Sequence, residues 1–89
     1  MKLKDISEYC LRNGVLVYEK RDEKDGRKRF YRINVPVFTE GETIPTSNYD
    51  YMVRKPKEIL EYVNKLLEDY TFRRNTARWV RTWFDVKVN

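Results

Sequence analysis

Arg74, Arg78 and Arg81 stand near the end of the chain at spacings of four and three, which would align them along one stripe of a helix. Arg73 directly precedes this stripe. A guanidinium group can donate two hydrogen bonds to one phosphate, so a row of arginines is typical of a phosphate-binding surface. The same stripe also fits the solvated face of an amphipathic helix whose arginines pair with the protein's own carboxylates.

A second group of residues with this chemistry lies in the first half of the chain. Phe30 lies between Lys28 and Arg32 on one face of the expected hairpin. If it is exposed, it can stack on a nucleobase while the two cations hold phosphates. Packing of the phenylalanine under a second layer, and pairing of the cations with facing glutamates, are the alternative interpretations. The candidate residues of this group are Arg27, Lys28, Arg29, Phe30 and Arg32.

No pattern of catalytic residues accompanies these cations. Asp22-Glu23-Lys24 matches the acidic-x-Lys part of a metal-dependent nuclease core, but that core needs a buried strand and a further carboxylate, whereas these residues are expected at an exposed hairpin tip. The chain has no histidine and one cysteine, which removes the commonest general base and any structural zinc site. Its three glycines are too far apart for a phosphate-binding loop. We therefore expect no enzymatic activity, no cofactor and no metal.

The net charge of +5 is unevenly distributed along the chain. Residues 14–38 carry seven Lys/Arg against four Asp/Glu, and residues 72–89 carry five against one. Residues 56–71, in contrast, have a net charge of −2. Segregated charge produces a directed electrostatic field, which favours an anionic partner.

Periodicity predicts the elements that must position these residues. Leu3, Ile6 and Cys10 predict a helix over residues 3–12, and Asn13-Gly14 would end it. A hairpin is expected over residues 15–37, followed by a loop over 38–48 and a third strand over 49–54 with Tyr49, Tyr51 and Val53 on one side. The apolar stripe of residues 57–70 predicts a long helix with Pro56 in its first turn.

The hairpin has a predicted register. Asp25-Gly26 is a strong two-residue turn signal, and it would pair residues whose numbers sum to 51. One face would then be largely apolar, with Leu16 opposite Val35 and Tyr18 opposite Ile33. Opposite charges would also face each other in three pairs, which are Asp22 with Arg29, Glu23 with Lys28, and Glu19 with Arg32.

The end of the chain shows a new apolar phase. The residues that share this new face are Phe72, Trp79, Val80, Trp83 and Phe84. A helix is predicted over residues 75–84, with Asn75 or Thr76 as its cap. The two tryptophans are expected mainly in the core, because large aromatic residues supply much of a small core. Residues 85–89 alternate valine with polar residues and are a candidate strand.

The bulk properties indicate a single small α+β domain over residues 1–89. No apolar window reaches the ~18 residues of a membrane span, and no secretory signal is visible. Cys10 cannot form an internal disulfide, since it is the only cysteine, and it is expected to be an unreactive core residue. These features favour a cytoplasmic setting.

The expected order of helix, hairpin, third strand and helix resembles that of double-stranded-RNA-binding domains, and Lys55-Pro56-Lys57 is similar to the basic start of their second helix. A charged hairpin followed by a helix also resembles the arm-binding domains of tyrosine recombinases. Both resemblances concern element order alone and assign no functional residue. The small, basic, histidine-free composition is common among virus- or phage-encoded accessory proteins.

Two functions from different classes follow from the sequence. The first is nucleic-acid binding, with DNA slightly favoured over RNA, mainly through phosphate contacts and with weak sequence preference. It assumes that the cations of residues 27–32 and 73–81 converge on one exposed surface. The second is a protein-binding module, either an inhibitor, an adaptor or a homodimer, that uses the aromatic and arginine-rich segment of residues 72–84.

Overall fold

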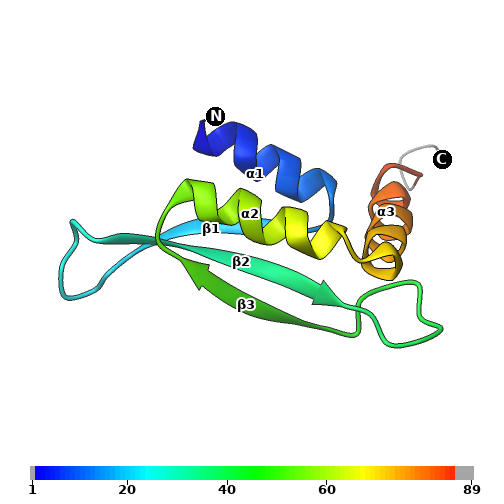
Figure 1. Cartoon of the computed structure of the whole chain (residues 1–89). Coiled ribbons are helices and arrows are strands. Elements are labelled where there is room, and N and C mark those ends of the chain that lie inside the picture. Colours follow the sequence, from blue (N-terminus) through cyan, green and yellow to red (C-terminus); the bar gives the residue numbers. More distant parts are fainter. Residues whose placement is uncertain (1, 86–89) are drawn as a thin grey trace.

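The computed structural model describes residues 2–85, and for residues 84 and 85 the backbone alone (Figure 1). Within this range the order of elements is α1 (Leu3–Arg12), β1 (Leu16–Arg21), β2 (Arg29–Val37), β3 (Ser47–Val53), α2 (Pro56–Leu67) and α3 (Tyr70–Asp85). The three strands form an antiparallel sheet in the order β1-β2-β3. The predicted α+β fold is confirmed, including the third strand.

Helices α1 and α2 cover one face of the sheet, and α3 lies beyond the end of the sheet that is remote from the β1–β2 loop (Figure 1). Side chains of a strand alternate between its two faces. On β2, Tyr31, Ile33 and Val35 are buried toward the helices, whereas Arg32 and Asn34 lie on the opposite face. The second face of the sheet is thus left without a covering helix in the described part of the chain.

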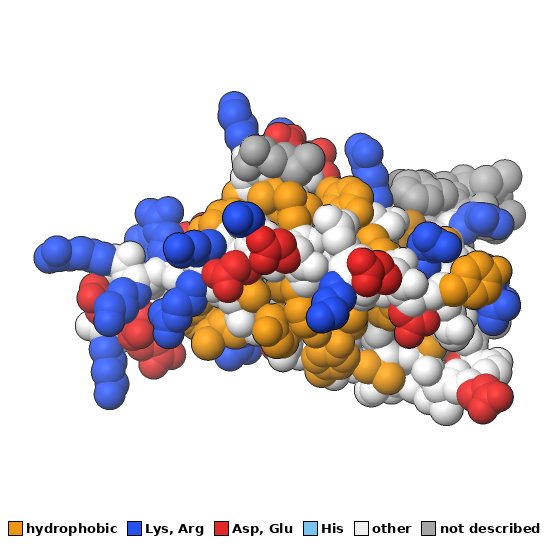
Figure 2. All heavy atoms as spheres, in the orientation of Figure 1, with side chains coloured by type: hydrophobic (Ala, Val, Ile, Leu, Met, Phe, Trp, Pro, Cys, Tyr) orange, Lys and Arg blue, Asp and Glu red, His pale blue; other side chains and the backbone are white. Residues whose placement is uncertain are grey.

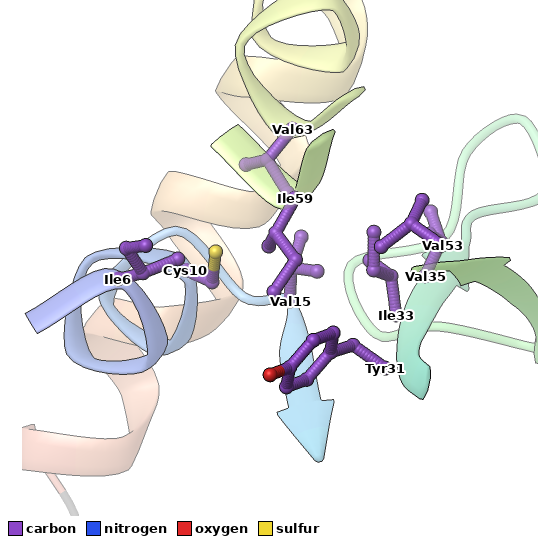
Figure 3. Packing of buried hydrophobic residues seen from close by; sticks show 9 residues of the cluster. All are labelled: Ile6, Cys10, Val15, Tyr31, Ile33, Val35, Val53, Ile59 and Val63. Atoms are coloured by element: carbon purple, nitrogen blue, oxygen red, sulfur yellow. The ribbon is translucent and has the colours of Figure 1, made fainter. Parts of the chain in front are cut away.

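The core forms where α1, α2 and the inner face of the sheet meet (Figure 3). Ile33 and Ile59 are fully buried at its centre, with Ile6 and Cys10 contributed by α1. Removal from water disfavours the thiolate and raises the pKa of Cys10 to about 11. Cys10 is thus a buried, protonated core residue, in keeping with its predicted role.

The predicted register of the hairpin is wrong by one residue. The numbers of paired residues sum to 50, so that Val17 lies opposite Ile33 and Leu16 opposite Asn34. A shift of one residue moves every side chain of a strand to the other face. Leu16 is consequently 51% exposed, while Val15 and Val17 face the core in its place.

The connection from α1 and the form of the β1–β2 loop explain this register. Val15 donates a backbone hydrogen bond to the Cys10 carbonyl, which directs its side chain toward the core immediately before β1. The loop is not a two-residue turn at Asp25-Gly26: Lys28 N–H donates to the Asp25 carbonyl, and Asp22 N–H to the Lys28 carbonyl. A type I′ turn needs positive φ at both central residues, and in the described chain only Gly14 and Gly41 have it.

The boundary between the last two helices also differs from the prediction. Helix α2 ends at Leu67, and α3 begins at Tyr70, several residues before the predicted start. The Asp69 carboxylate accepts hydrogen bonds from the N–H groups of Thr71 and Phe72, and so caps α3 in place of Asn75 or Thr76. Thr76 lies inside the helix, fully buried, and its hydroxyl donates to backbone carbonyls of the preceding turn.

The third strand has the predicted orientation. Val53 is buried, and on the same side of β3 the Tyr51 ring stacks on Tyr62 of α2 with a centroid separation of 4.0 Å. The Tyr49 and Tyr62 hydroxyls are 3.0 Å apart. The strand proposed for the tail lies outside the described residues, apart from Asp85, which ends α3. None of the helices described here is long and apolar enough to cross a membrane.

Candidate nucleic-acid interface

The two basic regions of the sequence lie at opposite ends of the molecule. The β1–β2 loop forms one end and α3 the other, and the molecule is 44 Å long (Figure 1). Lys and Arg side chains gather at both ends in the space-filling view, and acidic side chains lie between the ends and also among the cations of the loop end (Figure 2). The assumption that all predicted cations converge on one compact surface is therefore wrong, because the length of the sheet separates them.

The β1–β2 loop directs its two aspartates back onto its own backbone. The Asp22 carboxylate accepts hydrogen bonds from the N–H groups of Lys24 and Asp25, and the Asp25 carboxylate accepts one from Arg27 N–H. Arg27 and Lys28 are exposed, and neither has a carboxylate within 4.0 Å among the described side chains. Local hydrogen bonding thus occupies the loop aspartates, while Arg27 and Lys28 face solvent in a loop that also contains the exposed Glu23.

The other predicted residues of the hairpin are partly engaged. Arg29 forms an ion pair with Glu19 at 3.4 Å, and Arg32 forms one with Asp50 at 3.3 Å. The three charge pairs predicted from the register are therefore not the ones formed, since the shift of one residue changes which side chains face each other. Phe30 lies beside Arg32 on the uncovered face of the sheet and is half-buried.

The arginines of α3 are held by contacts within or near their own helix. The guanidinium groups of Arg73 and Arg74 lie 5.9 and 5.8 Å from the Tyr70 ring centroid, and Tyr70 is itself 63% exposed. Arg78 donates to the Asn75 side-chain oxygen at 3.0 Å. Both Arg74 and Arg78 line a polar cleft that also contains two glutamates of the loop before β3, Glu40 and Glu42. The Arg81 side chain is exposed.

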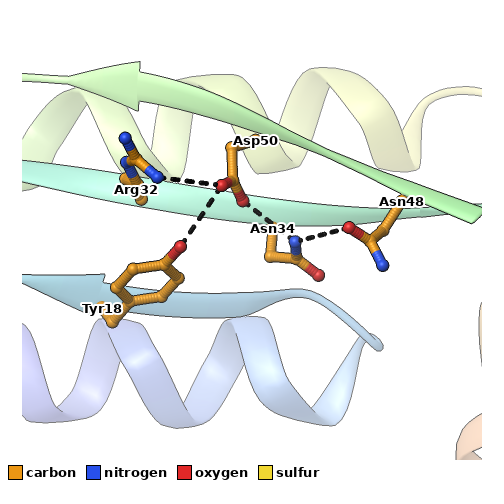
Figure 4. A network of polar contacts seen from close by, with 5 residues as sticks. All are labelled: Tyr18, Arg32, Asn34, Asn48 and Asp50. Carbon is orange, nitrogen blue, oxygen red and sulfur yellow. Dashed lines mark hydrogen bonds and ion pairs between the residues drawn. The ribbon is translucent and has the colours of Figure 1, made fainter.

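A polar network on the uncovered face of the sheet joins all three strands (Figure 4). At its centre is the Asp50 carboxylate, which accepts hydrogen bonds from Tyr18 O–H at 3.3 Å and Asn34 Nδ2 at 2.9 Å, in addition to its contact with Arg32. Asn34 Nδ2 also donates to Asn48 Oδ1 at 3.1 Å. The network connects five exposed or half-buried side chains, and it includes four residues that sequence reasoning did not single out as site residues.

The missed residues had a recognisable signal. On β2, polar or charged residues alternate with Tyr31, Ile33 and Val35, and on β3 Asn48 and Asp50 alternate with Tyr49 and Tyr51. That alternation places Asn34, Asn48 and Asp50 on one face once the two strands are paired. Sequence alone did not supply the pairing, because a loop of nine residues separates β2 from β3.

The network gives Asp50 a defined pH dependence. Hydrogen bonding to Asn34 lowers the pKa of the Asp50 carboxyl below 3.8, with further contributions from Tyr18 and Arg32. Because the folded-state pKa is the lower one, this stabilisation is complete above the ordinary pKa and is lost as the pH falls through the folded-state value.

We expect the melting temperature of the wild type to exceed that of Asp50→Asn at neutral pH, and the difference to shrink as the pH falls below the ordinary pKa of an aspartate and through the lower folded-state pKa of Asp50. Circular dichroism melts of both proteins across this range measure the difference. A difference that stays constant over the whole range would contradict the assigned role of the carboxylate.

Known proteins offer no guide to what these surfaces do. Comparisons with protein-family models, with curated proteins and with solved structures each gave no match to this chain. Among the described residues, no group of three or more Cys, Asp or Glu side chains is arranged to hold a metal ion. The likeness to double-stranded-RNA-binding domains remains one of element order, and the function must be argued from the surfaces themselves.

Proposed function

We propose that the protein binds nucleic acid, DNA or RNA, chiefly through phosphate contacts made by its two cationic ends. The observation that carries this proposal is the β1–β2 loop, where Arg27 and Lys28 project without carboxylate partners in the described chain while the loop aspartates bind backbone amides. The phosphates of a flexible polyanion can pair with these two cations, and the release of counterions supplies the affinity.

The distance between the two ends suits an extended ligand. The molecule is 44 Å long, and one turn of a DNA duplex spans about 34–36 Å. Cations at the two ends can therefore contact phosphates about one turn apart on a duplex, or well-separated phosphates of a single strand. Helix α2 lies between the ends (Figure 1), and its acidic residues Glu58 and Glu61 disfavour a continuous phosphate track over that helix.

Ion pairing within the protein reduces the number of cations available to the ligand. Arg29 and Arg32 hold carboxylates, so their contribution to phosphate binding is expected to be smaller than that of Arg27 and Lys28. Exposed ion pairs contribute little stabilising free energy, however, so a phosphate can compete for a guanidinium that a surface carboxylate holds. Phosphate contacts depend on the charge and spacing of the phosphates and not on the bases, so the preference for one base sequence over another is expected to be weak.

A salt titration tests the proposal. Fluorescence anisotropy of a labelled 20-mer, as a duplex and as a single strand, is expected to show affinity falling steeply between about 50 and 300 mM salt. The logarithmic slope is expected near −3 to −5, which corresponds to about four to six phosphates contacted. Absence of binding at low salt, or affinity that is independent of salt, would reject nucleic-acid binding.

One observation favours a second candidate function, the binding of a protein partner. Three aliphatic side chains, Leu11, Leu16 and Ile44, are 47, 51 and 59% exposed around a single groove that Trp79 and Trp83 also line. Exposed apolar groups beside tryptophans are typical of interaction hot spots.

A further inference from the structure

The groove lies where the uncovered face of the sheet meets α3. It has a volume of about 520 Å³, within the usual range of small-ligand pockets. Its walls come from every part of the fold except α2: Leu16 at the start of β1, Asn34 on β2, Ile44 and Asn48 before and on β3, and the two tryptophans of α3. Most of the lining is apolar, and the two asparagine amides are its main polar groups.

The aromatic wall is held in a fixed position. The rings of Trp79 and Trp83 meet edge to face with centroids 4.9 Å apart, and Phe38 packs edge to face on Trp79 at 6.1 Å. Gly14 lies directly against this wall, since a Cβ atom there would be 3.4 Å from the Trp79 ring. Both tryptophans are only half-buried, so a planar ligand in the groove has an aromatic surface on which to stack.

The polar network determines which atoms the two amides present to the groove. An ionised carboxylate only accepts hydrogen bonds, so the atom of Asn34 that faces Asp50 must be its amide nitrogen. That nitrogen also donates to Asn48, so the atom of Asn48 that faces it must be the carbonyl oxygen. Asn34 Oδ1 and Asn48 Nδ2 have no hydrogen-bonding partner among the described residues. One acceptor and one donor are thus left over, on two side chains that are hydrogen-bonded to each other and both line the groove.

We propose that the groove binds one unpaired nucleobase of a nucleic-acid strand, stacked on the tryptophan wall and hydrogen-bonded to Asn34 Oδ1 and Asn48 Nδ2. Every nucleobase has a donor next to an acceptor on its Watson–Crick edge, which complements the pair of atoms that the amides present. In a duplex the partner strand occupies that edge, so the groove selects unpaired bases. This inference rests on the proposed nucleic-acid binding and specifies its substrate as a strand with unpaired bases.

The leftover amide groups favour a base over an apolar protein side chain. An aliphatic anchor would remove both amides from water without replacing their hydrogen bonds, which is unfavourable. A base satisfies both amides and buries its own faces against the tryptophans. Arg74 and Arg78 lie on the opposite stripe of the same helix, where the phosphates of the strand can compete with their contacts to Tyr70 and Asn75.

The experiment compares four probes on the intact protein: a mixed-sequence single strand, its duplex, an abasic oligomer of equal length, and a free mononucleotide. Trp79 and Trp83 are the only tryptophans of the chain, so intrinsic fluorescence reports the groove directly. We expect quenching by the single strand, at least tenfold weaker binding of the duplex and of the abasic oligomer, and weaker binding still of the mononucleotide.

Two variants test the assigned atoms. Asn48→Ala removes the free donor from an exposed side chain and is expected to weaken single-strand binding about fivefold to tenfold without changing duplex binding. Asn64→Ala is the matched control, because Asn64 is an exposed amide on α2 that bonds Tyr9 outside the groove. The Asn64→Ala variant is expected to bind the single strand and the duplex with the same affinities as the wild type.

The outcomes separate this inference from the function on which it rests. Equal, salt-dependent binding of the normal and abasic strands would overturn the base site and leave phosphate binding intact. No binding of any strand would overturn both. If a mononucleotide bound as tightly as the strand, the groove would be a site for free nucleotides, and the proposal of a strand as its ligand would be rejected. Unchanged fluorescence with all four probes, together with a dimer in light scattering, would reject the base site in favour of a protein in the groove.

Discussion

Replacing Arg27 and Lys28 together with glutamate is expected to weaken binding of a nucleic-acid strand about a hundredfold at low salt. The substitution removes two cations and adds two anions at the tip of the β1–β2 loop. Neither side chain has a carboxylate partner among the described residues, so the change acts on the ligand rather than on an internal ion pair. Anisotropy titrations at about 50 mM salt measure the loss, and the salt slope is expected to become shallower by about two.

The matched control is the double variant Lys57→Glu with Lys65→Glu. It changes the net charge by the same amount, but both lysines lie on α2 between the two basic ends, and Lys57 forms only a 3.8 Å contact with Glu61. This control is expected to lose only a few-fold in affinity, through the reduced overall charge. If both double variants lost affinity equally, the loop would have no special role and binding would reflect net charge alone.

Gly14→Ala is expected to destabilise the fold by about 2–3 kcal/mol, a substantial part of the 5–15 kcal/mol typical of a small domain. Gly14 has a φ of +81°, which is unfavourable for any residue with a Cβ atom. A Cβ atom there would also be 3.2 Å from Thr76 Cβ, inside the buried contact between the end of α1 and α3. Urea unfolding followed by circular dichroism measures the loss.

Gly41→Ala separates the two causes of this loss. Gly41 has nearly the same backbone conformation, with a φ of +85°, but a Cβ atom there would meet nothing within 4 Å. Its replacement is expected to cost only about 1 kcal/mol, from the backbone alone. The Gly14 variant should also shift the tryptophan emission, because Trp79 packs on the same residue, whereas the Gly41 variant should not. Equal losses in the two variants would show that packing of α3 on Gly14 contributes nothing.

The separation of the two basic regions changes how binding is expected to depend on ligand length. A short oligomer can reach only one end of a molecule 44 Å long, whereas a longer strand can contact both. The groove lies at the α3 end, so an unpaired base there would leave the β1–β2 loop to hold phosphates farther along the strand. Contacts at both ends of one ligand reinforce each other through effective concentration.

Local patterns in the sequence determined the elements of this protein. The apolar spacing of Ile59, Val63 and their neighbours predicts α2 because a helix repeats every 3.6 residues, and such a stripe has only one way to face a core. Asn13-Gly14 marks the end of α1 because few residues other than glycine adopt positive φ. The buried face of β2 follows from its alternation. Arg27 and Lys28 of the β1–β2 loop were likewise identified from the sequence as candidate phosphate-binding residues.

Only the tertiary structure decided how those elements and their charges combine. The turn signal of Asp25-Gly26 was overridden because the connection from α1 turns Val15 inward, and burial of that side chain fixes the register. The ion pair of Arg32 with Asp50, the orientation of Asn34, and the placement of Trp79 against Gly14 all join residues far apart in the chain. Spacing along a sequence contains no information on such contacts, because they depend on which faces the packed core leaves exposed.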